Sequence, residues 1–315
     1  MNKVLVLGGT GFVGRHVCEQ LTRQGIRVTV PTRRAIHAQH IQMLPQVDVL
    51  EADINQEGVL EQLLPGHDAV VNLVAVLHGN RKRFERVHVQ LPQRLAQAMK
   101  ASGVQRLVHI SALGASAAAS SLYQQTKAAG EAALAAHNLA LTVLRPSVIF
   151  GAEDKFLNMF ARMQAVLPLV PLACASAKFQ PVWVGDVAKA VLRSLQDPQT
   201  VGKTFEIAGP QVFTLESLVK LAGRLSGNPR TVIGLPLPLG YLQAIVMQSI
   251  PGEPLLSTDN IAAMETDNVA SGTEGADLQA LGITAAAVEP VAALYLDGAG
   301  KADPLLKVRL FASKR

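Results

Sequence analysis

The sequence predicts a doubly wound α/β fold, in which helices cover both faces of a parallel sheet, together with a smaller C-terminal cap. Three observations carry this prediction. Short runs typical of buried strands alternate with amphipathic stretches through the first half of the chain. A glycine-rich turn joins the first of these runs to the first helix. After Gly151 the alternation weakens and prolines become frequent.

The predicted strands are short and apolar, as in a sheet that is covered on both faces. They are Lys3–Leu7, Arg27–Val30, Val47–Leu50, Ala69–Val74, Arg106–Ile110, Leu141–Arg145, Gln180–Val184 and Thr204–Ile207. Helices are expected at Phe12–Gln24, Phe84–Ser102 and Asp186–Leu195. Pro92 should kink the second helix, because proline cannot donate a hydrogen bond to residue 88.

This order of elements predicts two domains. Residues 1–150 and about 176–209 would form the larger, nucleotide-binding domain, because they carry the alternating strands and helices. Residues 151–175 and about 210–315 would form the smaller substrate or cap domain.

Composition narrows the class of protein. Of 315 residues, 49% are hydrophobic and 17% are charged, which excludes a disordered chain. Cys18 and Cys174 make neither a disulfide framework nor a thiolate metal site, so a reducing, cytoplasmic setting is expected. The chain offers no run of about 20 uninterrupted apolar residues, so no membrane-spanning helix is expected. His37 and His40 have no third ligand at a suitable spacing, and we expect no metal.

Charge argues against one class of partner. The formal net charge is only +5, and the basic residues gather in local clusters. Aromatic side chains are nearly absent from these clusters, whereas nucleic-acid surfaces interleave the two, so we expect no nucleic-acid partner.

The glycine-rich turn is typical of a dinucleotide site. It reads Gly8-Gly9-Thr10-Gly11-Phe12-Val13-Gly14 and follows the first strand directly. Gly8 permits the tight turn, Gly11 lets the backbone approach a pyrophosphate, and Gly14 lets helix and strand pack closely. The helix that follows offers free N–H groups and the positive end of its dipole to phosphates. The turn therefore predicts a Rossmann-type fold.

The end of the second strand predicts which dinucleotide binds. It carries Thr32, Arg33 and Arg34, where NAD-binding folds place a carboxylate for the ribose 2′-hydroxyl. Two guanidinium groups suit a 2′-phosphate, so NADP(H) is preferred over NAD(H). The alternative is that both arginines lie on a solvated helix start.

The end of the third strand predicts an adenine contact. Asp53 can accept a hydrogen bond from the adenine amine while Ile54 packs on the ring. The alternative for Asp53 is a helix N-cap before a helix that begins near Gln56.

Three residues form the candidate catalytic group. Tyr123 and Lys127 are four residues apart, so on a helix they share a face. A nearby ammonium group is expected to lower the pKa of the phenol, which would then exchange protons near neutral pH. Ser111 ends the fifth strand, where its hydroxyl can hold a substrate carbonyl or alcohol.

These motifs resemble those of the short-chain dehydrogenase/reductases. The segments NLVAVL (72–77), HISALGAS (109–116), YQQTKAAGE (123–131), LRPSVIFG (144–151) and FQPVWVGDVAKA (179–190) are similar to one atypical branch. That branch contains the NADPH-binding accessory subunit of respiratory complex I and free-standing bacterial relatives of the epimerase/dehydratase type. The resemblance implies bound NADP(H), with Val74 and Ala75 beside it and Pro146 and Val148 lining its nicotinamide end. Two features depart from the wider family: only eleven residues separate Ser111 from Tyr123, and His88 stands where Asn is usual.

Three functions fit these features. The first is an NADP(H)-dependent oxidoreductase, with Tyr123 as general acid/base, Lys127 as its electrostatic partner and ribose ligand, and Ser111 positioning a small-molecule substrate. The second is a non-catalytic NADPH-binding accessory or assembly protein with respiratory or quinone-biosynthetic partners. The third is a nucleotide-sugar epimerase or dehydratase.

The cap favours an apolar ligand. No charged residue lies between Arg162 and Lys178, or between Arg230 and Glu253. A nucleotide-sugar pocket needs groups that pair with a diphosphate. We therefore expect a quinone- or isoprenoid-like ligand, or a membrane-edge partner, at Leu235–Ile250, with the protein peripheral to an inner membrane. The alternative is an ordinary buried cap helix.

Overall fold

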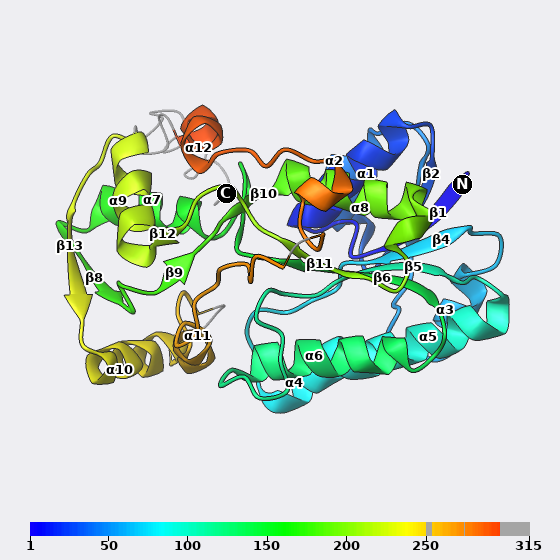
Figure 1. Cartoon of the computed structure of the whole chain (residues 1–315), viewed down its shortest axis with the longest axis horizontal. Coiled ribbons are helices and arrows are strands. Elements are labelled where there is room, and N and C mark those ends of the chain that lie inside the picture. The colour runs from blue at the N-terminus through cyan, green and yellow to red at the C-terminus, as the bar shows by residue number, and fades with distance from the viewer. Residues whose placement is uncertain (250–253, 274, 297–315) are drawn as a thin grey trace, which may run out of the picture.

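A parallel seven-stranded sheet lies at the centre of the larger part of the molecule (Figure 1). The computed structural model describes residues 1–249, 254–273 and 275–296. The strands of this sheet are β1 (Lys3–Leu7), β2 (Arg27–Thr32), β3 (Val47–Glu51), β4 (Ala69–Asn72), β5 (Arg106–Ile110), β6 (Ala140–Pro146) and β11 (Thr204–Ile207). The predicted doubly wound α/β fold is confirmed.

The strand order places a ligand-binding position at the carboxyl edge of the sheet. The order is β11-β6-β5-β4-β1-β2-β3, and every neighbouring pair is parallel. The chain winds outward from β1 through β2 and β3, then returns to β4 and continues on the other side. The reversal lies between β1 and β4, and ligands of such sheets bind beside the carboxyl ends of the strands at that point.

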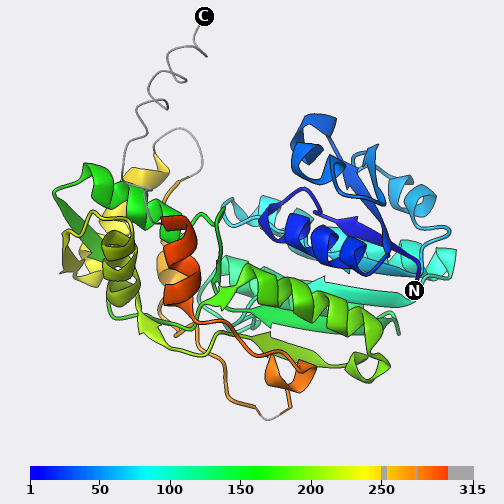
Figure 2. The same ribbon diagram turned by 90° about the horizontal axis from the view of Figure 1, so that it is seen from above.

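Helices cover both faces of the sheet. On one face lie α1 (Phe12–Arg23) and α8 (Val184–Gln196), which are seen from above in Figure 2. On the other face lie α3 (Val59–Leu63), α5 (Leu91–Ser102) and α6 (Leu122–Ala135). Successive residues of a strand point to opposite faces, so Val4 and Val6 join the first layer and Leu5 and Leu7 join the second.

The predicted helix Phe84–Ser102 is wrong in detail. The structure has α4 (Arg81–Glu85), then a π-helical turn at Arg86–Gln90, and then α5, whose second residue is Pro92. The irregularity therefore falls just before Pro92, where the expected hydrogen bond to residue 88 is missing. The turn packs tightly on α6, since a Cβ on Gly130 would lie 2.0 Å from the carbonyl oxygen of His88.

The predicted strand Gln180–Val184 does not join the central sheet. Pro181 interrupts it, because proline has no N–H for the ladder. The structure has β9 (Lys178–Phe179), which pairs antiparallel with β12 (Phe213–Thr214), and β10 (Val182–Trp183), which pairs parallel with β7 (Ile149–Phe150).

The smaller unit lies at the carboxyl edge of the sheet (Figure 1). It contains α7 (Leu157–Val166), β8 (Leu169–Ala173), α9 (Leu215–Leu225), β13 (Thr231–Leu235), α10 (Leu237–Gln248), α11 (Thr258–Ala263) and α12 (Val288–Leu296). Helices α7, α9 and α12 share one apolar core, and α10 and α11 share another with β8. We propose that these cores define the second domain of the predicted division, although Leu278 and Leu281 of its C-terminal part pack into the core beneath α8.

Membrane-spanning character and the basic residues near the C-terminus concern possible membrane or acidic partners. Within residues 1–249, 254–273 and 275–296, no helix combines the length and apolar character needed to cross a bilayer. The basic residues Lys307, Arg309, Lys314 and Arg315 lie outside the described residues.

Candidate functional site

The glycine-rich turn connects β1 to α1 with a hydrogen bond from the N–H of Gly11 to the carbonyl of Gly8, at 3.0 Å. Gly8 has φ +84°, a conformation that favours glycine. A Cβ on Gly14 would lie 2.2 Å from the carbonyl oxygen of Gly8, so no larger residue fits there. The turn thus brings its backbone against the start of α1, as its spacing predicts.

The start of α1 has the character of an anion site. Its first three N–H groups, of Phe12, Val13 and Gly14, have no acceptor within the helix. No side chain caps this end in the described part of the chain, and its first turn carries no acid. The Nε of Arg15 is buried without a partner among the described residues. These groups fit the pyrophosphate of a dinucleotide.

The end of β4 lies against the glycine turn. A Cβ on Gly8 would lie 3.3 Å from the nitrogen of Val74. The N–H of Val74 donates to the side chain of Asn72 at 3.2 Å, and that of Val76 donates to Nε2 of His88 at 3.1 Å. Val74 and the exposed Ala75 therefore lie in a loop whose path is fixed by two buried polar side chains.

Thr32 ends β2, and Arg33 and Arg34 follow it at the same edge of the sheet. Thr32 is buried and its hydroxyl donates to the carbonyl of Arg34 at 3.2 Å, whereas both guanidinium groups are exposed. Arg34 precedes a short 3₁₀ helix, Ala35–Ala38. Arg33 and Asp53 line the same surface hollow.

Asp53 does not cap a helix, so that alternative is wrong. Helix α3 begins at Val59, after Gly58. The carboxylate of Asp53 instead accepts from the backbone N–H of Asn55 at 3.0 Å and from its amide at 2.8 Å. The backbone hydrogen bond from Asn55 lowers the pKa of Asp53, and the charges of Arg33 and Arg86 lower it further. Ile54 is partly buried against the core on the α5 side.

Tyr123 and Lys127 both lie on α6, as predicted. Lys127 is fully buried, and its ammonium group donates to the carbonyl of Ile110 at 2.7 Å. Because Ile110 precedes Ser111, this contact places the ammonium group beside the end of β5. The ring of Tyr123 packs edge-on against His88, with centroids 5.4 Å apart.

The expected lowering of the tyrosine pKa is wrong. Burial raises the pKa of Tyr123 to about 12, because the phenolate would lose its hydration. Burial also lowers the pKa of Lys127 to about 8, against the opposing charge of Glu131. The phenol is therefore protonated at neutral pH.

Ser111 is placed as a ligand-binding group would be. Its backbone N–H donates to the carbonyl of Leu144 at 2.8 Å, which anchors it at the end of β5. Its hydroxyl is buried and has no hydrogen-bond partner among the described residues. A buried polar group without a partner is rare and points to a ligand or a water that completes it.

Sequence reasoning missed a group of buried polar residues behind this site. His88 donates from Nδ1 to the hydroxyl of Thr126 at 3.0 Å, and His109 accepts from the amide of Asn72 at 3.2 Å. Burial, and then the charge of Lys127, lower the pKa of His88 to about 3 and also lower that of His109. Both imidazoles are neutral at physiological pH. The unusual His88 was the only signal of this group in the sequence.

Pro146 and Val148, which the resemblance places at the nicotinamide end, lie at and just after the end of β6. Pro146 is buried, and its carbonyl accepts from the N–H of Leu113 at 2.9 Å. The N–H of Val148 donates to the side chain of Asn268 at 3.1 Å. A second residue of the smaller unit, Asp259, accepts hydrogen bonds at the start of α6. Neither contact could be predicted from the sequence, because each joins residues more than a hundred positions apart.

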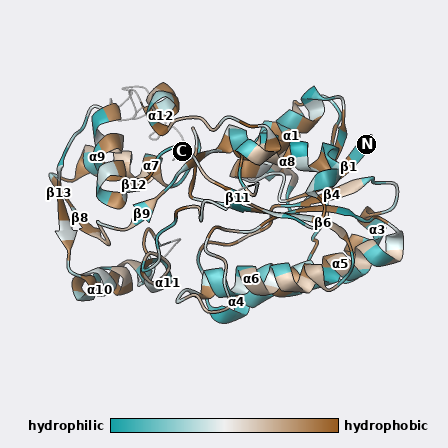
Figure 3. Ribbon diagram, viewed as in Figure 1, coloured by the Kyte–Doolittle hydropathy of each residue, from teal (hydrophilic) through white to brown (hydrophobic). Residues whose placement is uncertain are grey.

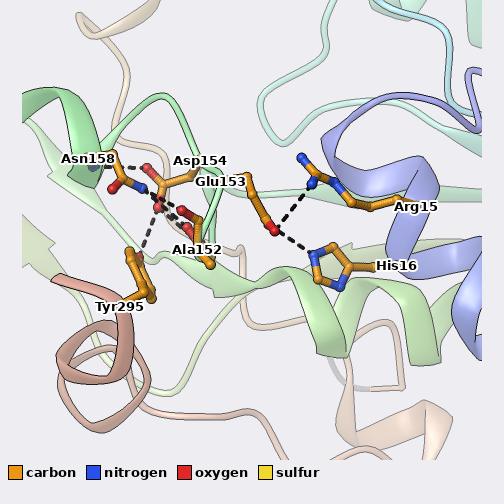
Figure 4. A network of polar contacts seen from close by, with 8 residues as sticks. Arg15, His16, Ala152, Glu153, Asp154, Asn158 and Tyr295 are labelled. Atoms are coloured by element: carbon orange, nitrogen blue, oxygen red, sulfur yellow. Dashed lines mark hydrogen bonds and ion pairs between the residues drawn. The ribbon is translucent and has the colours of Figure 1, made fainter. Parts of the chain in front are cut away.

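A polar network joins the start of α1 to the smaller unit (Figure 4). Glu153 pairs with Arg15 at 3.2 Å and with His16 at 3.4 Å. The adjacent Asp154 is buried and accepts from the hydroxyl of Tyr295 on α12 at 2.9 Å. The loop that follows β7 is thus held between the dinucleotide-type turn and the cap.

The family follows from comparison with known proteins. Residues 4–208 match the NAD dependent epimerase/dehydratase family. The chain belongs to this family. Among its relatives is the mitochondrial NADH dehydrogenase [ubiquinone] 1 alpha subcomplex subunit 9 of Mus musculus, which is 36% identical over 84% of this chain and 72% of its own length. The ceramide reductase of Caulobacter vibrioides is 26% identical over 76% of this chain and 75% of its own length.

Solved structures agree with membership of the NAD dependent epimerase/dehydratase family at the level of the fold. A UDP-glucose 4-epimerase of Thermus thermophilus, solved with NAD, superimposes with a TM-score of 0.72 at 21% identity and covers 95% of this chain and 99% of its own. A UDP-glucuronic acid 4-epimerase of Bacillus cereus has the same TM-score at 17% identity and the same coverage.

Proposed function

We propose that this protein is an NADP(H)-dependent reductase of an apolar, quinone- or isoprenoid-like substrate. The observation that carries the proposal is the arrangement at the end of β5. There the ammonium group of Lys127 contacts the Ile110 carbonyl, and Ser111 presents a buried hydroxyl without a described partner. Tyr123 lies one helical turn from Lys127 on the same face of α6.

Each of these residues has a part in the reaction. When bound, the nicotinamide supplies a hydride. The hydroxyl of Ser111 donates a hydrogen bond to the substrate carbonyl and orients it. Tyr123 donates its phenolic proton to the same oxygen as the alcohol forms, and its raised pKa supports reduction because the phenol is protonated at neutral pH. Lys127 holds the ribose and, through its positive charge, stabilises the phenolate that remains.

The preference for NADP(H) is supported by charge. Arg33 and Arg34 are exposed at the end of β2, the position where NAD-binding folds carry an acid. Arg86, which belongs to the basic cluster of Arg81, Lys82, Arg83 and Arg86, is close enough to Asp53 to lower its pKa together with Arg33. Three guanidinium groups therefore contribute positive charge near the carboxyl end of β2, where it would suit a 2′-phosphate.

The exposed apolar side chains of α10 support an apolar substrate. Leu239, Leu242, Ile245 and Val246 are each more than half exposed, while the small residues Gly240 and Ala244 face inward. The large apolar side chains of this helix therefore face solvent. Figure 3 shows the hydropathy of α10 along its ribbon. Exposed apolar patches of this kind mark lipid or protein contacts. The ceramide reductase among the relatives, whose name denotes a lipid substrate, supports the same conclusion.

A non-catalytic accessory role is the second candidate. The relative with 36% identity is a subunit of NADH dehydrogenase, which supports contact with a respiratory complex. In that role the bound dinucleotide would stiffen the fold and α10 would contact the partner or the membrane edge.

Turnover separates the two functions. The purified chain is loaded with NADPH and mixed with decylubiquinone or a medium-chain aldehyde, and NADPH absorbance is followed. We expect oxidation that Tyr123→Phe slows by about 100-fold or more with unchanged NADPH affinity. Tyr295→Phe is the matched control, because it also removes a phenolic hydroxyl but lies on α12, outside the candidate catalytic group and outside α10. Tight NADPH binding without oxidation by either acceptor would favour the accessory role.

A further inference from the structure

We propose that Asp259 and Asn268 are positioning residues that hold the two walls of the nicotinamide site at a fixed separation. Both belong to the stretch that follows α10 in the smaller unit, and each bonds to a different stretch of the larger unit. The proposal rests on the proposed function, because it takes Tyr123 and Val148 as the residues that face the nicotinamide.

Asp259 completes the first turn of α6. Its carboxylate accepts from the N–H of Leu122 at 2.6 Å, from the N–H of Tyr123 at 3.2 Å and from the hydroxyl of Ser121 at 2.9 Å. The Ser121 oxygen in turn accepts from the N–H of Gln124 at 3.4 Å. The N–H groups of the first three helical residues are thus satisfied, two of them by a residue 136 or more positions away.

The charge of Asp259 strengthens this contact. A carboxylate at a helix N-terminus interacts favourably with the helix dipole, and charge-assisted hydrogen bonds are stronger than neutral ones. Ser121 is fully buried, and Asp259 itself is partly buried. The direction of the turn that carries Tyr123 therefore depends on where α11 lies.

Asn268 makes the corresponding contact on the opposite wall. Its side-chain oxygen accepts from the hydroxyl of Ser147 at 2.6 Å and from the N–H of Val148 at 3.1 Å. Its backbone is fixed on both sides, since its N–H donates to Lys178 and its carbonyl accepts from Gln180. Asn268 therefore holds the Ser147–Val148 link between β6 and β7 in place.

The stretch that carries both residues is itself rigidly placed. A reciprocal capping box between Ser257 and Asn260 defines the start of α11. Ile261 is fully buried against Ala173 and Ala244 of the cap. A movement of the cap would therefore carry Asp259 with it and tilt the first turn of α6. Figure 1 shows α11 between α10 and this end of α6.

The test compares Asp259→Asn with Asp267→Asn. Asp267 is a matched control: it lies on the same stretch, is exposed, and accepts from the backbone N–H of Lys178 at 3.1 Å. We expect Asp259→Asn to lower kcat by about tenfold to 100-fold with KM and the Kd for NADPH changed less than about twofold, since small displacements affect the reacting geometry before they affect binding. Asp267→Asn should match the wild type.

A second measurement does not need turnover. The fluorescence emission of bound NADPH reports the surroundings of the nicotinamide ring, and we expect it to shift in Asp259→Asn and not in Asp267→Asn. If the wild type shows no turnover, the proposed function fails, whereas the emission still decides the positioning role. Wild-type kcat and emission in Asp259→Asn, or a loss of kcat that only follows a loss of NADPH affinity, would overturn the proposal. Asp259→Glu, which keeps the charge but lengthens the side chain, replaces Asp259→Asn if that variant does not fold.

Discussion

The surroundings of Lys127 make it sensitive to pH. Its ammonium group is fully buried and donates to one carbonyl oxygen, and burial lowers its pKa to about 8. In an unfolded chain a lysine has a pKa of about 10.4. Between these two values the unfolded chain holds more protons than the folded one, so the free energy of unfolding rises with pH.

We expect Lys127→Met to remove this rise. Between pH 8 and about 10, the difference in unfolding free energy between wild type and variant should change by up to about 1.4 kcal/mol per pH unit in favour of the wild type. Urea unfolding at several pH values measures it. The raised pKa of Cys18 gives an opposite slope in both proteins and cancels in the difference. Parallel curves would contradict the prediction.

Alanine substitutions at two glycines of the turn should have different effects, one on stability and the other on NADPH affinity. Gly14→Ala puts a Cβ 2.2 Å from a backbone oxygen, so we expect a loss of stability of at least about 2 kcal/mol. Gly11→Ala meets the same oxygen at 3.3 Å, which a small adjustment relieves, yet it adds a methyl group where a pyrophosphate would approach. Gly11→Ala should fold with near wild-type stability and bind NADPH at least about tenfold more weakly. Thermal unfolding and NADPH titration of both variants check this, and equal behaviour would count against it.

Local sequence patterns predicted those site residues whose relative positions are set by a few residues of spacing within one element. The glycine turn and the helix that carries Tyr123 and Lys127 follow from spacing alone. The pKa of Tyr123 did not, because it depends on burial by neighbours that are distant in sequence. Asp259 and Asn268 were hidden for the same reason: a carboxylate that caps a helix more than a hundred residues away leaves no local signal.

Among the elements, α10 differs from an ordinary surface helix. A helix on the outside of a soluble protein turns its apolar stripe to the core. Here Gly240 and Ala244 permit close packing on β8, and the larger leucine, isoleucine and valine side chains are left outside. The charge-free run was visible in the sequence, but the outward direction of its large side chains required the structure.

We expect this face to bind lipid. Full-length protein should sediment with anionic phosphatidylglycerol vesicles, and Leu242→Asp/Val246→Asp should lower the partition by at least about tenfold, since each buried aliphatic side chain contributes about 1.5–3 kcal/mol. Leu294→Asp is the control, because Leu294 is 85% exposed on a different helix, α12. Equal sedimentation of the two variants would exclude α10 as the contact.

The elements of the sheet were largely predictable, because its strands, apart from the exposed edge strand β3, are buried and apolar and lie between turns. The segment at Gln180–Val184 has a similar composition, yet Pro181 interrupts it, and only Val182–Trp183 forms a strand, which pairs with β7 outside the central sheet. The sequence pattern also did not predict the π-helical turn before Pro92. A proline kink can take several forms, and packing against Gly130 favours this one.

For the whole molecule, ligand binding and folding are linked. A ligand that binds only the folded state stabilises it by about 2.7 kcal/mol at 100 times its Kd. At equal concentrations NADPH should therefore raise the Tm more than NADH does. Arg33→Ala/Arg34→Ala should remove the difference, and Arg27→Ala, at the far end of β2, should keep it. Thermal unfolding with each dinucleotide checks this, and equal shifts in the wild type would contradict the preference.

The contact between Asp259 and α6 also limits how such chains can be recombined. A chimera that joins residues 1–150 and 176–209 to the cap of a relative would inherit a helix start with two open N–H groups beside Tyr123, unless the incoming cap brings a carboxylate to the same place. Sheet and cap therefore cannot be exchanged as independent modules. Substitutions at Ser121 and at Asp259 are expected to be tolerated only in compatible pairs, so that a new cap and the helix it closes must change together.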